Sequence, residues 1–166
     1  MDARAQPSGS RFKFWLPAIA WAILISWLST DTFSSGHTSR YILSVLQWVL
    51  PHASGDTLEW LQFLIRKAAH FTEYFVFSFF LLRAVRGEHR GWQIRWAITA
   101  LVIAAGYSAL DEFHQWFVPS RTASPWDSLL DTTGAATAQF VLWLWLRFSS
   151  RQGTDAVEEV APAPRD

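Results

Sequence analysis

The sequence contains no cysteine and few charged residues. The absence of Cys among 166 residues excludes disulfide bonds, thiolate metal sites and cysteine nucleophiles. Charged residues make up 17% of the chain, against roughly 25% in an ordinary soluble domain, and fourteen Lys and Arg residues balance fourteen Asp and Glu residues. This composition is not typical of a disordered chain or of a nucleic-acid-binding protein, so we expect no nucleic acid partner.

Apolar and aromatic residues are abundant instead. Hydrophobic residues make up 51% of the chain and 11 residues are Trp, with a mean hydropathy of +0.11. A membrane-spanning helix needs roughly 20 mostly apolar residues, and four segments approach that length: residues 14–29, 57–83, 96–116 and 125–148. The sequence therefore predicts an all-α integral membrane protein with four transmembrane helices, in one domain over residues 12–148.

The first of these segments resembles the core of a signal peptide. It follows the basic residues Arg4, Arg11 and Lys13, but residues 30–33 after it offer no small-residue cleavage site. We therefore expect an uncleaved first transmembrane helix, preceded by a cytoplasmic tail over residues 1–11.

Capping signals predict where two of the helices begin. Asp56 and Glu59 have the spacing of a capping box before the second helix. Before the fourth, Ser124 suits the N-cap, Pro125 the first helical position and Asp127 the third. Capping and a favourable interaction with the helix dipole would by themselves explain Asp127.

Residues 41–50 form a further, short apolar helix candidate that Pro51 closes. Ten residues are too few to cross a bilayer. This helix either lies in the outer interface of the membrane, which we expect, or re-enters the bilayer. Residues 149–166 are acidic and rich in Pro and Ala, which predicts a disordered C-terminal tail.

Lys and Arg are distributed unequally between the two sides of the membrane. With the N-terminus inside, ten of these residues fall on the inner side and four on the outer side. Because cytoplasmic segments carry the excess of positive charge, we expect both termini in the cytoplasm.

Polar residues interrupt three of the predicted helices, and on each helix they share one face. Charges at bilayer depth are costly unless they pair or contact water, so we expect these faces to converge on one pocket in the outer half of the membrane. The positions are Arg66, Lys67, His70, Glu73 and Tyr74 on the second helix, Tyr107, Ser108, Asp111, Glu112, His114 and Gln115 on the third, and Asp127, Asp131, Gly134 and Ala138 on the fourth. The spacing of Gly134 and Ala138 favours close helix packing.

Two further patterns concern pairs of these side chains. His70 with Glu73, and Asp111 with His114, are each one helical turn apart, a workable spacing for metal ligands. Such pairs are common, however, and we expect neither a metal nor a cofactor. In the loop before the fourth helix, a turn at Pro119 would bring Arg121 over the end of the third helix, so we expect Arg121 to pair with Glu112.

The motifs resemble those of a known family. The sequences RKAAHFTEY at 66–74, DEFHQ at 111–115, PSR at 119–121 and residues 127–134 are similar to successive motifs of the VanZ-like family. These are small bacterial multi-span membrane proteins named for a member associated with teicoplanin resistance. The resemblance implies a multi-pass protein of the bacterial cytoplasmic membrane that acts at the cell envelope.

The resemblance also implies a set of site residues. It would carry over Lys67, His70, Tyr74, Glu112, Gln115, Arg121, Asp127 and Gly134. This sequence departs from the family pattern at two positions. Ser120 stands where the family usually has Gly, and Asp131 stands where it usually has Asn, which adds a negative charge to the site.

Together, these features predict an outward-facing site that binds a lipid headgroup, an envelope precursor or a glycopeptide antibiotic. Its expected ligand-binding residues are Arg66, Lys67, His70, Glu73, Tyr74, Asp111, Glu112, Gln115, Arg121, Asp127 and Asp131. The alternative is a membrane enzyme acting on a lipid-linked envelope precursor. In that case Arg66, Lys67 and Arg121 would hold a phosphate, and the catalytic candidates Glu112 or His70 would move a proton.

Overall fold

The computed structural model describes residues 9–30, 35–89, 91–117 and 124–158, and these residues form five helices and no strand. The prediction of an all-α fold is therefore confirmed. The helices are α1 (Gly9–Leu28), α2 (Ser35–Val49), α3 (Gly55–Arg86), α4 (Ile94–Gln115) and α5 (Pro125–Glu158).

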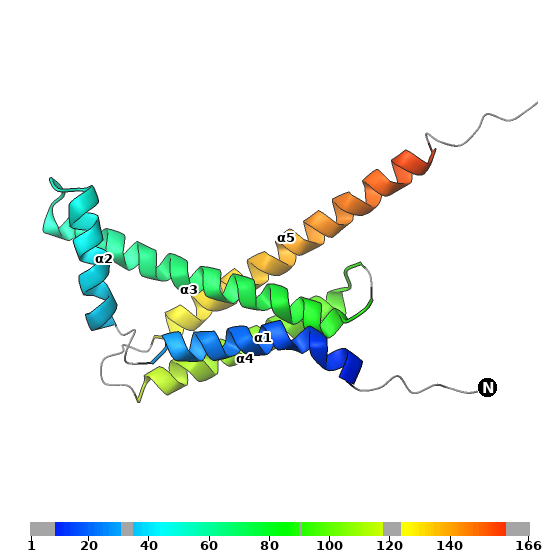
Figure 1. Ribbon diagram of the computed structural model, residues 1–166, viewed down its shortest axis with the longest axis horizontal. Helices are drawn as coiled ribbons and strands as arrows, with labels where there is room; N and C mark the ends of the chain where they lie inside the picture. The colour runs from blue at the N-terminus through cyan, green and yellow to red at the C-terminus, as the bar shows by residue number, and fades with distance from the viewer. Residues whose placement is uncertain (1–8, 31–34, 90, 118–123, 159–166) are drawn as a thin grey trace, which may run out of the picture.

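The four long helices form a bundle around α3, which packs against α1, α4 and α5 (Figure 1). Lys13 at the start of α1 lies 3.4 Å from Glu88, just after α3. At the opposite end of the bundle, α1 and α4 end and α5 begins. The short helix α2 contacts the first part of α3 and lies across the direction of the bundle, and the last turns of α5 extend away from it (Figure 1).

Small residues let the helices approach closely. Ala100 and Ala104 of α4 and Ala135 and Ala138 of α5 have no exposed surface. A Cβ atom on Gly134 would overlap the main-chain carbonyl of Phe71 on α3. The close packing expected from Gly134 and Ala138 is therefore confirmed.

The start of α3 differs from the prediction, and the start of α5 agrees with it. The hydroxyl of Ser54 caps α3 by accepting a hydrogen bond from the Thr57 N–H at 3.3 Å, so the capping box predicted two residues later is wrong. For α5, the hydroxyl of Ser124 accepts a hydrogen bond from the N–H of Trp126 at 3.3 Å.

Helices α2 and α5 extend furthest beyond their predicted ranges. Helix α2 begins at Ser35 rather than at residue 41, and α5 continues to Glu158, ten residues beyond its predicted end. Residues 149–158, where we expected the disordered tail to begin, are thus helical in the structure. Neither extension contains proline, and a helix that has already formed adds residues readily.

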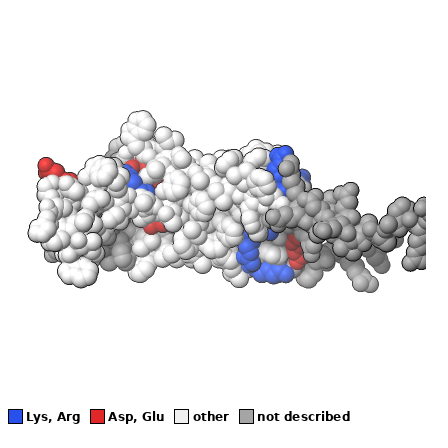
Figure 2. All heavy atoms as spheres, turned by 90° about the horizontal axis from the view of Figure 1, so that it is seen from above, with Lys and Arg blue, Asp and Glu red and all other residues white. Residues whose placement is uncertain are grey.

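Two helices among the described residues are long and apolar enough to cross a membrane: α1, over Arg11–Leu28, and α4, over Ile94–Gln115. Helices α3 and α5 carry charged residues of the predicted polar faces, as the last turns of α4 do with Asp111 and Glu112. Figure 2 shows charged side chains on one face in two groups, with an uncharged band between them. Arg95 and Asp111 on α4, and Asp131 and Arg147 on α5, are each sixteen residues apart, which is about 24 Å along a helix.

Candidate functional site

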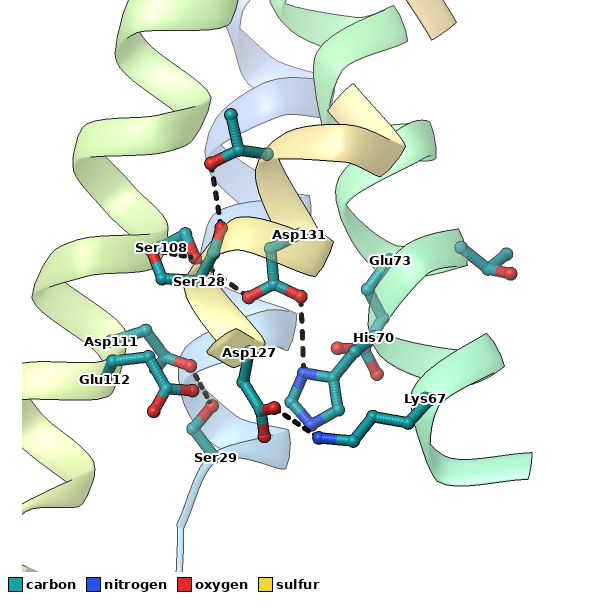
Figure 3. Close-up of polar contacts among 12 residues, drawn as sticks. Ser29, Lys67, His70, Glu73, Ser108, Asp111, Glu112, Asp127, Ser128 and Asp131 are labelled. Atoms are coloured by element: carbon teal, nitrogen blue, oxygen red, sulfur yellow. Dashed lines mark hydrogen bonds and ion pairs between the residues drawn. The ribbon is translucent and has the colours of Figure 1, made fainter. Parts of the chain in front are cut away.

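The predicted polar residues gather at the end of the bundle where α1 and α4 end and α5 begins, beside the middle of α3 (Figure 3). The local sequence explains this placement. Ser124 and Pro125 start α5 at this level, so the first turns of α5 carry Asp127 and Asp131 towards α3 and α4.

An ion pair joins α3 to the first turn of α5. The ammonium group of Lys67 donates to Oδ1 of Asp127, and the side chains of the two residues are 28% and 15% exposed. Asp127 is therefore more than a helix cap. Arg66 and His70 lie beside this pair and line a pocket of about 210 Å³, which we call the basic pocket. Its lining residues are Phe63, Arg66, Lys67, His70, Ser124 and Asp127.

Asp131 connects three helices. Its side chain is 1% exposed, and Oδ1 lies 3.6 Å from Nδ1 of His70 on α3. Its other oxygen accepts a hydrogen bond from the hydroxyl of Ser108 on α4 at 2.8 Å. The carboxylate of Asp131 thus faces an imidazole and accepts a hydrogen bond from a hydroxyl group, which partly compensates its buried charge.

Asp111 connects α4 to α1. Its Oδ2 accepts hydrogen bonds from the hydroxyl of Ser29 at 2.7 Å and from the side-chain amide of Gln115 at 3.0 Å. The predicted site omits Ser29, although a serine at the end of an apolar span is a usable signal for a polar contact. A second contact from α1 runs from the indole N–H of Trp21 to the main-chain oxygen of Glu73, at 2.9 Å.

Tyr74 and Glu112 are buried with polar atoms that have no hydrogen-bond partner among the described residues. Tyr74 has no exposed surface, and its hydroxyl is the unpartnered atom. Glu112 is 7% exposed. Its Oε2 accepts a hydrogen bond from the N–H of Ser124 at 2.8 Å, whereas its Oε1 has no partner.

Glu112 lines a second pocket, of about 340 Å³, between the end of α4 and the start of α5. We call it the aromatic pocket. It is lined by Ala109, Glu112, Phe113, Trp116, Ser124, Pro125 and Ser128. The structure thus brings the described residues of the predicted site to one end of the bundle but divides them among separate pockets. Two of these, the basic pocket and the aromatic pocket, share Ser124.

Some predictions are not addressed by these contacts. Arg121, with Pro119 and Ser120, lies outside the described residues, so its pairing with Glu112 stays a prediction. His114 lines a separate pocket with Asp111. No group of three or more His, Asp or Glu side chains that could hold a metal occurs in the part of the chain that the structure describes.

Comparison with known protein families shows that the VanZ/LLP1 family matches residues 14–147 of the chain, which include all four motifs of the site. The chain belongs to the VanZ/LLP1 family. No curated protein and no solved structure matches it. Membership of the VanZ/LLP1 family, together with the two apolar helices α1 and α4, identifies a membrane protein.

Proposed function

We propose that this VanZ/LLP1 protein crosses the bacterial cytoplasmic membrane four times, with both termini in the cytoplasm. The alternating directions of α1, α3, α4 and α5 support this topology. So does the spacing of about 24 Å between the charged positions at the two ends of α4 and α5, which is close to the roughly 30 Å hydrocarbon thickness of a bilayer. The ten-to-four distribution of Lys and Arg then makes the polar site face outward.

In this topology α2 lies in the outer interface of the membrane. Tyr41, Val45 and Trp48 are 78%, 60% and 84% exposed, and their spacing places them on one face of the helix. An apolar face that includes a Trp, on a helix lying across the bundle, is typical of contact with the headgroup region.

The proposed function is recognition of a phosphate-bearing lipid headgroup or envelope precursor in the basic pocket. The observation that carries it is that Arg66, Lys67 and His70 line one pocket at the start of α5. Guanidinium and ammonium groups are the usual ligands of phosphate oxygens. The N-terminus of a helix adds positive potential and free N–H groups. Asp127 holds Lys67 in place until a phosphate competes for it.

The link to glycopeptide susceptibility follows from the family. A protein that holds an envelope precursor, or the glycopeptide itself, at the outer surface would change how much of the drug reaches its target. We propose that binding at this site is the origin of the resistance associated with teicoplanin in the VanZ-like proteins that this chain resembles.

Binding of phosphatidylglycerol to the purified protein tests the proposal. Arg66 forms no ion pair with a described residue, so Arg66→Gln removes a phosphate ligand without stranding a buried charge. Affinity should fall about tenfold, the value of one charge-assisted hydrogen bond. Arg95→Gln, at the other end of the bundle, is the matched control and should change affinity less than Arg66→Gln. Equal effects of the two variants would contradict the proposal.

Proton transfer is the second candidate function, and the position of His70 favours it. His70 lines the basic pocket beside Arg66 and Lys67, and the buried carboxylate of Asp131 faces its Nδ1. A carboxylate that orients an imidazole is a common arrangement for a general base. Glu112, the other catalytic candidate, lines the aromatic pocket instead. An enzyme would release phosphate from a lipid-linked precursor and lose that release in His70→Gln, whereas a protein that only binds the precursor would release no phosphate in either form.

A further inference from the structure

Glu112 is the one charged residue among the described residues that line the aromatic pocket, and one of its carboxylate oxygens has no hydrogen-bond partner there. Glu112 is more than nine-tenths buried. Its Oε2 accepts the hydrogen bond from Ser124 N–H. Its Oε1 has no hydrogen-bond partner among the described residues, although the side chain lines a pocket of about 340 Å³. A buried carboxylate oxygen without a partner is costly, so a donor in the pocket would stabilise the protein.

The residues that line the aromatic pocket indicate which kind of hydrogen-bond donor would bind there. Phe113 and Trp116 are 61% and 77% exposed, and they line the pocket together with Pro125 and Ala109. Aromatic rings attract cations through their faces, and Glu112 attracts a cation and repels an anion. A carboxylate beside aromatic rings therefore suits an organic ammonium group, whereas a purely apolar ligand would leave the buried charge uncompensated.

We propose that the aromatic pocket binds the primary ammonium group of a lipid headgroup. This inference rests on the proposed function, because the phosphate of the same headgroup would bind in the basic pocket. Ser124 lines both pockets, so the two pockets are neighbours at the start of α5, and the proposed ligand is one headgroup that carries both charges. The ligand is then an aminophospholipid, with its phosphate at Arg66 and Lys67 and its ammonium at Glu112.

The test measures binding of two lipids with identical acyl chains to the intact protein in detergent. Dioleoyl phosphatidylethanolamine carries the ammonium group, and dioleoyl phosphatidylglycerol does not. The unmodified protein is expected to bind the first lipid about tenfold more tightly. Glu112→Gln is expected to remove that preference, so that the two lipids bind the variant with similar affinity. Asp56→Asn, which removes an exposed carboxylate in the first turn of α3, is the matched control and keeps the preference.

A second variant covers the case in which Glu112→Gln does not fold. Trp116→Leu changes an exposed ring that lines the pocket and should lower the preference about three- to fivefold, the effect of one cation–π contact. Free ethanolamine, which lacks the phosphate and the acyl chains, should not displace the bound lipid at millimolar concentration. Displacement would overturn the assignment to a lipid and point to a soluble amine.

The remaining outcomes separate this inference from the proposed function. If Arg66→Gln weakens both lipids while Glu112→Gln leaves the preference intact, the phosphate site stands and the ammonium site is wrong. If Glu112→Gln removes the preference while Arg66→Gln has no effect, the ammonium site stands and the proposed function is wrong. If Arg121→Gln creates a preference that the unmodified protein lacks, the chain's own Arg121 occupies the pocket and the inference is overturned.

Discussion

Lys67 and Asp127 form an ion pair that joins the middle of α3 to the first turn of α5. Because both side chains are mostly buried, Lys67→Gln or Asp127→Asn alone should lower the free energy of unfolding by about 1–3 kcal/mol, between the values for surface and buried pairs. The double variant should cost less than the two single changes added. Thermal unfolding of the four proteins in detergent measures this difference.

The pair of Lys13 and Glu88 is the internal control for that experiment. Its side chains are 56% and 64% exposed, so Lys13→Gln should cost at most about 0.5 kcal/mol. Additive effects at Lys67 and Asp127, or an equally large effect at Lys13, would show that the pair does not stabilise the bundle.

Gly134 is predicted to be intolerant of any side chain. A Cβ atom there would overlap the carbonyl of Phe71, so Gly134→Ala should force α5 away from α3 and destabilise the protein by about 1–3 kcal/mol. Gly106 on α4 is the matched control, since a Cβ atom there would meet nothing within 4 Å. Gly106→Ala should be neutral or stabilise the helix by up to about 1 kcal/mol. Similar melting temperatures for the two variants would contradict the close packing.

Asp131 should tolerate replacement by the residue that the family usually has there. Asp131→Asn keeps an acceptor for the Ser108 hydroxyl and removes a buried charge, so stability should change by less than about 1 kcal/mol. Asp131→Leu also removes the hydrogen-bond acceptor, so Ser108 and His70 lose their contacts with this side chain. The free energy of unfolding should fall by about 1–3 kcal/mol. Thermal unfolding of the two variants measures the difference. Equal destabilisation by Asp131→Asn and Asp131→Leu would mean that the negative charge itself is required.

The orientation in the membrane is open to a reporter experiment. Alkaline phosphatase is active only outside the cytoplasm, and it should be inactive when fused after Ser150 and active when inserted within residues 120–123. The proposed topology requires this pattern because the loop before α5 lies on the outer side. The reverse pattern would place the basic pocket on the cytoplasmic side.

The contacts between the polar faces of α3 and α5 could be predicted from helical spacing. Lys67 and His70 share a face of α3, and Asp127 and Asp131 share a face of α5. Two charged faces inside a membrane domain must meet. The ion pair of Lys67 with Asp127 and the approach of His70 to Asp131 are what that requirement predicts.

The separation of the basic pocket from the aromatic pocket could not be predicted from helical spacing. Whether Glu112 faces the space beside Lys67 or the space beside Trp116 depends on the rotation of α4 against α5. The contact of Ser29 with Asp111 likewise depends on the register of α1. Sequence periodicity describes the faces of one helix at a time, so it does not predict how two helices are rotated or shifted against each other.

The central claim, that a phosphate binds in the basic pocket, is tested most directly by solid-state NMR. The chain has two lysines, Lys13 and Lys67, so the Lys13→Arg variant labelled with ¹⁵N at the lysine Nζ reports on Lys67 alone. In bilayers of phosphatidylethanolamine and phosphatidylglycerol, we predict a ¹⁵N–³¹P dipolar coupling that corresponds to direct contact, and its loss in the Arg66→Gln background. A Lys67 ammonium group with no coupling to lipid phosphorus would contradict the account.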